Sequence, residues 1–109
     1  MGVTEDLVID LDDLAAKLDQ SSVLLLSHMR GHICDMDALM ALCDAAQVTV
    51  IEDCAHTMGA DWNGTPSGRF GKFGCYSTQT YKHVNSGEGG LLISDDADGM
   101  ARAIMLSGS

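Results

Sequence analysis

Three residues with possible chemistry follow predicted strands of this chain. Asp53 comes directly after the apolar run VTVIE, whereas Ser77 and Lys82 lie at and just beyond the end of FGCYS. In open α/β sheets, ligands bind beyond the carboxyl ends of the strands, so a carboxylate, a hydroxyl and an amine are expected to meet at one edge. An amine attacks a carbonyl carbon only in its neutral form. Lys82 is therefore a possible nucleophile if its site favours loss of the proton.

The segments around these residues alternate between strand and helix patterns. SSVLLLSH is a short unbroken apolar run, which predicts a strand covered on both faces. CDMDALMALCDAA places apolar residues at helical spacing behind Asp35 as N-cap, and VTVIED follows as a β-branched strand. Strand, helix and strand in this order predict a right-handed βαβ unit with parallel strands.

The flanking segments complete an expected α/β fold. DLDDLAAKLDQ predicts a short amphipathic helix capped by Asp10, and DADGMARAIMLS predicts a last helix behind an aspartate cap. GGLLISDD predicts a strand antiparallel to FGCYSTQ, because the residues between them lack the helical pattern that a parallel crossover needs. Residues 54–72, rich in glycine and holding the single proline, are expected to be irregular.

Composition and charge narrow the class of protein. The chain has 109 residues, 46% of them hydrophobic, which fits one globular domain. A formal net charge of -10 disfavours nucleic acid and anionic membrane surfaces as partners. The longest apolar run is too short for a membrane helix and the N-terminus is acidic, unlike a signal peptide, so we expect a cytoplasmic location.

The cysteines and histidines do not form a recognisable metal motif. No C-x-x-C pair occurs, and His28, His32 and His83 do not share ligand spacing on one element, so no metal site is predicted. The cysteines are expected to be reduced residues of the core: Cys34, Cys43, Cys54 and Cys75.

Two longer segments resemble a known family. VIEDCAHTMGADWNG, followed by GRFGKFGCYSTQTYKHVNSGEGGLLISDD, resembles the DegT/DnrJ/EryC1/StrS family of pyridoxal-phosphate (PLP) sugar aminotransferases, members of the aspartate-aminotransferase fold type. The likeness runs from about Ser27 to the C-terminus and rests on several motifs in the same order and spacing. It implies a fragment of a three-layer α/β/α large domain, with a mostly parallel sheet and an antiparallel last strand.

The resemblance also implies a role for individual residues. Lys82 would form a Schiff base with the PLP cofactor and then act as general base and acid. Asp53 would pair with the pyridine nitrogen, which makes the ring an electron sink. His56 would contact the ring, and Ser77 would bind the phosphate. The implied reaction moves an amino group from a small-molecule donor to a keto-sugar, nucleotide-linked in this family.

Simpler interpretations of these residues stay open. Lys82 could be a solvated loop charge, Asp53 could cap a turn, and His56 could be a buried, hydrogen-bonded histidine. GEGG, residues 87–90, matches the family segment after the lysine, but its glycines also fit a tight turn before the last strand. A Ser77, His56 and Asp53 hydrolase is disfavoured, because no G-x-S-x-G pattern surrounds the serine.

The length of the chain departs from the family pattern. Enzymes of this fold type are several times longer, have a second, small domain and build their active site across a homodimer. We therefore expect residues 1–109 to be the central part of a large domain, with open sheet edges and apolar helix faces that favour self-association. The alternative hypothesis is a non-catalytic module that oligomerises or completes another chain.

Overall fold

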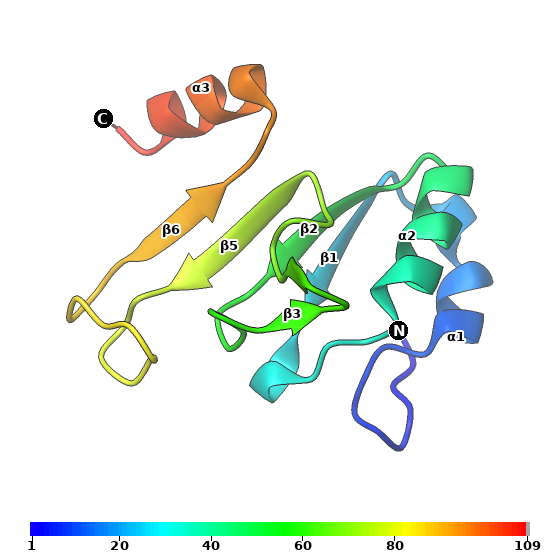
Figure 1. Cartoon of the computed structure of the whole chain (residues 1–109). Helices are drawn as coiled ribbons and strands as arrows, with labels where there is room; N and C mark the ends of the chain where they lie inside the picture. The colour runs from blue at the N-terminus through cyan, green and yellow to red at the C-terminus, as the bar shows by residue number, and fades with distance from the viewer. Residues whose placement is uncertain (109) are drawn as a thin grey trace.

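The computed structural model describes residues 1–108 and has an α/β architecture (Figure 1). A four-stranded sheet has the order β1-β2-β5-β6 and a two-stranded sheet pairs β3 with β4. The strands are β1 (Val23–Ser27), β2 (Thr49–Asp53), β3 (Asp61–Trp62), β4 (Thr65–Pro66), β5 (Phe73–Ser77) and β6 (Gly90–Ile93). The α-helices are α1 (Leu11–Ala15), α2 (Met36–Ala45) and α3 (Ala97–Leu106), and the short 3-10 helices are Leu18–Gln20 and Met29–Gly31.

The strand directions agree with those expected from the sequence. β1 and β2 run parallel with Ser27 opposite Asp53, and β2 and β5 run parallel with Asp53 opposite Cys75. β6 is antiparallel to β5. Because β1, β2 and β5 are parallel, the segments that follow them lie along one edge of the sheet, the lower edge in Figure 1. The parallel unit and the antiparallel last strand are thus confirmed.

Helix α2 covers one face of the sheet and contributes three residues to the buried core. The Asp35 side chain accepts a hydrogen bond from the Ala38 N–H at 2.9 Å, as expected for an N-cap. Met36, Leu39 and Cys43 are completely buried in a cluster with residues of the sheet. Burying one such large apolar side chain stabilises the fold by about 1.5–3 kcal/mol. Figure 1 shows α1 beside α2 on this side, with α3 set apart beyond β6.

The opposite face of β1 is open, which corrects the prediction that this strand is covered on both faces. Leu24 and Leu26 lie on the α2 side and are partly or fully buried. Val23 and Leu25, which alternate with them, are 47% and 67% exposed. An unbroken apolar run indicates that both faces can be buried, but burial of the second face requires an element that residues 1–108 do not supply.

The first helix is shorter than its sequence pattern indicated. Asp10 caps α1 as expected, since its Oδ1 accepts the N–H groups of Asp12 and Asp13 at 3.0 and 3.1 Å. After Ala15 the chain tightens, because the Lys17 N–H bonds to the Leu14 carbonyl three residues back. The predicted helical stretch therefore continues as the 3-10 helix Leu18–Gln20.

The stretch expected to be irregular contains the hairpin of β3 and β4. Asn63 and Gly64 form its two-residue turn with φ values of 51° and 84°, the double left-handed geometry that makes Asn-Gly a strong hairpin signal. The Asp37 Oδ2 accepts hydrogen bonds from Trp62 Nε1 at 3.2 Å and from Asn63 Nδ2 at 3.3 Å. These bonds fasten the hairpin to the first turn of α2.

Helix α3 has the predicted aspartate cap but no buried face. Asp96 accepts the Gly99 N–H at 3.0 Å, and this bond with the Lys72 ammonium at 2.9 Å holds the pKa of Asp96 below its ordinary value. None of the α3 residues is buried, and Ile104 and Met105 are exposed. Among residues 1–108, no helix has the length and apolar character needed to cross a bilayer.

The cysteines are free thiols, as the sequence indicated, and most of them are core residues. Cys34, Cys43 and Cys54 are buried, and Cys75 is partly buried. Burial disfavours the thiolate and raises the pKa of Cys34 and of Cys54 to about 11. These two thiols are therefore structural and poorly reactive.

Candidate functional site

Lys82 lies in a closed loop between β5 and β6. The base of this lysine loop, residues 78–89, is held by the Thr78 N–H bonded to the Gly89 carbonyl at 2.9 Å and by the Ser86 N–H bonded to the Thr78 carbonyl at 2.8 Å. The hydroxyl groups of Thr78 and Ser86 also lie 2.9 Å apart in a hydrogen bond. Inside the loop, the Lys82 N–H bonds to the Gln79 carbonyl at 2.9 Å. The segment that carries the amine is thus locally ordered.

The glycines that follow the lysine serve this loop geometry. Gly89 has a φ of 147°, and a Cβ atom there would lie 2.9 Å from Thr78 Oγ1 and 3.0 Å from Ser86 Oγ. Gly87 has a φ of 84°, also in the region that favours glycine. The structure supports the tight-turn interpretation of GEGG.

A cleft of about 470 Å³ opens at the edge where the parallel strands end. Its walls come from the segments after β1, β2 and β5. The lining residues are Met29, Arg30, Ala55, His56, Met58, Ser77, Tyr81, Lys82 and His83. Three of the residues expected at the site, His56, Ser77 and Lys82, are therefore brought together.

Lys82 is half-buried within the cleft, whereas its neighbours Tyr81 and His83 are exposed. Within residues 1–108, no carboxylate forms an ion pair with its ammonium group, and none of the lining residues is Asp or Glu. This environment differs from that of an ordinary solvated surface lysine. A nucleophilic amine benefits from such surroundings, since a paired carboxylate would stabilise its charged form.

Asp53 is placed beside the cleft, not in its lining. Its Oδ2 accepts a hydrogen bond from Ser27 Oγ at 3.2 Å, and its Oδ1 accepts the Ala55 N–H at 3.1 Å, so the turn-capping interaction expected as one alternative is present. Successive strand side chains alternate between faces, so Asp53, Cys75 and Ser77 share one face of β2 and β5. The carboxylate and the hydroxyl thus lie on the same side of neighbouring strands.

His56 is exposed, which excludes the interpretation as a buried histidine. Its Nδ1 accepts a hydrogen bond from the Arg30 backbone N–H at 3.0 Å. The imidazole is therefore oriented by the turn that follows β1, and it lines the cleft. Sequence spacing gave no sign of this contact, because 26 residues separate the two partners.

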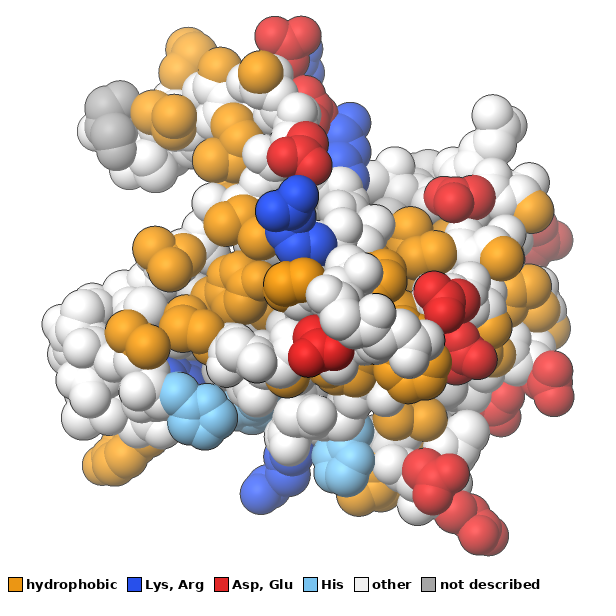
Figure 2. Space-filling view, viewed as in Figure 1, with side chains coloured by type: hydrophobic (Ala, Val, Ile, Leu, Met, Phe, Trp, Pro, Cys, Tyr) orange, Lys and Arg blue, Asp and Glu red, His pale blue; other side chains and the backbone are white. Residues whose placement is uncertain are grey.

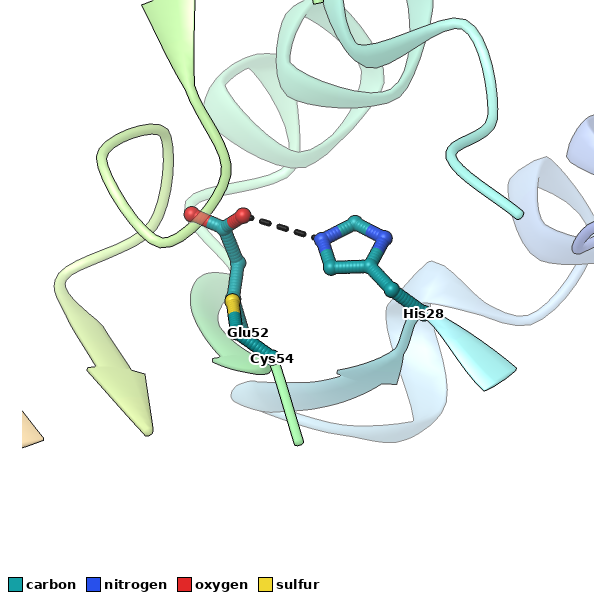
Figure 3. Close-up of side chains that lie close together, drawn as sticks. All are labelled: His28, Glu52 and Cys54. Atoms are coloured by element: carbon teal, nitrogen blue, oxygen red, sulfur yellow. Dashed lines mark hydrogen bonds and ion pairs between the residues drawn. The ribbon is translucent and has the colours of Figure 1, made fainter. Parts of the chain in front are cut away.

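A buried carboxylate next to Asp53 was not anticipated from the sequence. Glu52 is completely buried, and His28 Nε2 lies 3.0 Å from its Oε2 (Figure 3). The N–H groups of Gly68, Phe70 and Gly71 donate to the same carboxylate at 2.8, 2.8 and 2.7 Å. Burial favours the neutral acid, but the bond from His28 and the three N–H donors outweigh it and keep the pKa of Glu52 below its ordinary value.

The Glu52 cluster also includes Cys54, and the three potential ligand atoms lie within 4.8 Å of one another. Four hydrogen-bond donors already occupy the Glu52 carboxylate. This arrangement favours a structural role, in which the carboxylate holds the backbone of residues 68–71, over metal ligation. The available sequence signal was the alternation in VTVIED, which places Val50 and Glu52 on the same, core-facing side.

The sheet and its cleft together define a class of protein. A mostly parallel α/β sheet with a lysine, a serine and a histidine at its carboxyl edge is the arrangement of an α/β protein that binds a small ligand there. The chain belongs to the DegT/DnrJ/EryC1/StrS aminotransferase family, whose model matches residues 3–108.

Individual relatives agree with this assignment. L-glutamine:scyllo-inosose aminotransferase of Streptomyces griseus is 38% identical over 89 residues, which cover 82% of this chain and 21% of the relative. The crystal structure of AtS13 from Actinomadura melliaura has a TM-score of 0.83 and 36% identity, covering 90% of this chain and 28% of that one. The E coli GDP-4-keto-6-deoxy-D-mannose-3-dehydratase with bound hydrated PLP has a TM-score of 0.78 at 27% identity, covering 84% and 24%.

The matches cover most of this chain but only a small part of each relative. The chain spans about a fifth of the length of the curated relatives it matches. The family and the fold follow from these matches, and the family is PLP-dependent.

Proposed function

We propose that this chain contributes the lysine-bearing part of a PLP-dependent sugar aminotransferase, as the central portion of its large domain. One observation carries the proposal: in a member of this aminotransferase family, Lys82, Ser77 and His56 line a single cleft at the carboxyl edge of the sheet. The substrates we propose are a small-molecule amino donor and a keto-sugar, nucleotide-linked or free.

The residues present fit the cofactor in chemical type, and three of them line one cleft. Lys82 Nζ would bond covalently to the aldehyde of PLP, and Ser77 Oγ would donate a hydrogen bond to its phosphate. Asp53 would face the pyridine nitrogen from the same side of the sheet as Ser77, and His56 would contact the ring. When bound, PLP supplies an electron sink that stabilises the negative charge left by loss of the donor's Cα proton.

The chain's own residues then have separate tasks. Lys82 Nζ, once free, would take the proton from the donor's Cα as general base and deliver it to C4′ of the cofactor as general acid. The Asp53 carboxylate keeps its orientation because Ser27 Oγ and the Ala55 N–H each hold one of its oxygens. The half-buried position of Lys82 limits the access of water to the amine.

The names of the relatives support the substrate classes without fixing them. One relative is named for L-glutamine and scyllo-inosose, and another is named GDP-perosamine synthase. An amino acid donor and a cyclic keto acceptor are therefore proposed for the complete enzyme, with a homodimer as its assembly. The alternative, an interaction module without catalysis, is favoured by the open face of β1 and by the exposed apolar residues of α3.

Cofactor capture by Lys82 tests the proposal. PLP added to the chain should give a yellow adduct that borohydride fixes, and peptide mapping should locate it on Lys82. Lys82→Arg should abolish the adduct, whereas Lys17→Arg, a matched change just after α1 at a lysine paired with Asp13, should leave it unchanged. Adducts spread equally over several lysines, or retained in Lys82→Arg, would favour the interaction module.

A further inference from the structure

The turn after β1 holds an arginine in a fixed, unusual conformation at the cleft. Arg30 lies in the 3-10 helix Met29–Gly31 with φ 55° and ψ 22°, the left-handed region that residues other than Gly, Asn and Asp avoid. Its N–H donates to His56 Nδ1 at 3.0 Å, and the next N–H, of Gly31, donates to the His28 carbonyl at 3.1 Å. Two hydrogen bonds therefore hold the turn in place, and they fix the backbone position from which the Arg30 side chain extends.

The guanidinium of Arg30 has no carboxylate partner in a strongly acidic chain. The sequence holds 16 acidic and 6 basic residues, and Lys17, Arg69 and Lys72 each form an ion pair with an aspartate. Within the part of the chain that the structure describes, Arg30 and Lys82 form none, and both line the same carboxylate-free cleft.

The surface view agrees with a separation between the basic cleft and the acidic remainder of the surface. In Figure 2 histidine side chains and a basic side chain lie along the lower edge, where Figure 1 places the turn after β1 and the lysine loop. Acidic side chains gather mainly to the right and at the top. A cation-lined cleft on an acidic molecule concentrates anions locally.

The two cationic residues, Arg30 and Lys82, lie on different walls of the cleft. Arg30 follows β1 and Lys82 follows β5, with β2 between these strands in the sheet. Ser77, the residue assigned to the phosphate of PLP, is on the β5 side with Lys82. An anion at Arg30 would therefore be a group other than the cofactor phosphate.

We propose that Arg30 is a substrate-binding residue that holds an oxyanion of the second reactant. The identity of this reactant rests on the proposed function, since the anion would be either the carboxylate of an amino acid donor or the phosphate of a nucleotide-linked acceptor. The planar guanidinium fork matches the two oxygens of either group and makes paired charge-assisted hydrogen bonds.

Three variants test the site by direct binding. Arg30→Asn removes the guanidinium but tolerates the left-handed backbone, and Arg30→Lys keeps the charge without the fork. Arg102→Gln is the matched control, because Arg102 is also an exposed arginine, lies on α3, forms no ion pair within residues 1–108 and does not line this cleft. Binding of glutarate and of inorganic pyrophosphate is measured by calorimetry at low salt.

The expected result is a loss of affinity confined to Arg30. Arg30→Asn should weaken one probe about tenfold or more, Arg30→Lys should retain part of the affinity, and Arg102→Gln should bind as the parent chain does. Loss of glutarate binding identifies the carboxylate source, and loss of pyrophosphate binding identifies the phosphate source. Equal affinities in the parent chain and Arg30→Asn, an equal loss in Arg102→Gln, or no binding of either probe by the parent chain overturns the proposal.

The same samples separate this inference from the proposed function. If PLP forms its adduct on Lys82 but Arg30→Asn binds both probes normally, only the Arg30 site is refuted. If no adduct forms while Arg30→Asn still loses probe binding, the anion site stands and the proposed function fails. A lower PLP affinity in Arg30→Asn without loss of either probe would show that Arg30 holds the cofactor phosphate, which contradicts the assignment to the second reactant.

Discussion

Glu52 and Asp53 are consecutive carboxylates of β2 with opposite surroundings. The alternation of strand side chains directs Glu52 into the core toward His28, and Asp53 to the open face toward Ser27. The buried member accepts hydrogen bonds from the backbone of residues 68–71, and the other accepts them from Ser27 Oγ and the Ala55 N–H. The structure of the strand end thus depends on a residue that does not take part in the proposed chemistry.

Replacing Glu52 by glutamine should destabilise the fold strongly. An amide has only one acceptor oxygen and directs N–H groups at backbone N–H donors, so we expect a loss of about 3 kcal/mol in the free energy of unfolding at neutral pH. Glu88→Gln, an exposed glutamate, is the matched control and should change stability by less than about 0.5 kcal/mol.

The effect of Glu52→Gln should depend on pH in a defined direction. The folded-state pKa of Glu52 is lowered, so its stabilising effect is fully present above the unfolded-state pKa of about 4.3 and is lost as the pH falls through the lower folded-state value. Urea unfolding at several pH values should show the two proteins converging in acid. A constant difference down to the lowest pH would refute an ionised Glu52.

At the level of single residues, motif and local sequence predicted part of the site. Lys82, Ser77 and His56 lie in segments with a family pattern, and the cleft brings them together. Arg30, Ser27 and the partners of Glu52 could not be predicted, because their contacts join residues that are 16 or more positions apart and depend on strand register.

At the level of elements, local sequence signals predict where helices begin, but they do not predict which strand faces are buried. The caps Asp10, Asp35 and Asp96 act within a few residues and were correctly placed. The β3–β4 hairpin has an Asn-Gly signal in the sequence, but the glycine-rich composition of residues 54–72 predicts an irregular stretch there. The exposure of Val23 and Leu25 could not be deduced, because it depends on which elements cover the sheet.

The lysine loop should be sensitive to a methyl group at its base. Gly89→Ala would place Cβ against the hydroxyl groups of Thr78 and Ser86 and force an unfavourable φ, so the loop base should open. Gly87→Ala also forces a positive φ, 84° compared with 147° at Gly89, but no atom lies within 4 Å of the new Cβ, so this variant is the control without a collision.

Hydrogen exchange gives the measurement for this pair of variants. The amides of Thr78 and Ser86, both bonded at the loop base, should exchange about tenfold or more faster in Gly89→Ala than in Gly87→Ala, since each 1.4 kcal/mol of local stability corresponds to a factor of ten. The yield of the PLP adduct at Lys82 should fall in the same order. Equal protection in the two variants would mean that the hydroxyl contacts do not hold the loop closed.

At the scale of the whole molecule, the apolar open face of the sheet and the net charge of the chain have opposite effects on self-association. Its open face carries Val23, Leu25 and Leu92, which are 47%, 67% and 37% exposed, and β1 and β6 are both edge strands. Contiguous apolar surface and unpaired strand edges favour association. The net charge of -10 opposes it, since copies of the chain repel one another.

Self-association of the chain should therefore increase with salt and depend on the open face. Salt screens the repulsion between acidic copies but leaves the apolar attraction, so sedimentation velocity should show more oligomer at about 0.5 M than at about 0.05 M ionic strength. Leu25→Glu places a charge on the open face and should shift the chain toward monomer. Gln20→Glu adds the same charge at an exposed polar position outside the sheet and should have a much smaller effect. If the two variants behave alike, net charge controls the association and the open face does not. If the parent chain stays monomeric at high salt, the exposed apolar residues of β1 and β6 are too dispersed to hold two copies together.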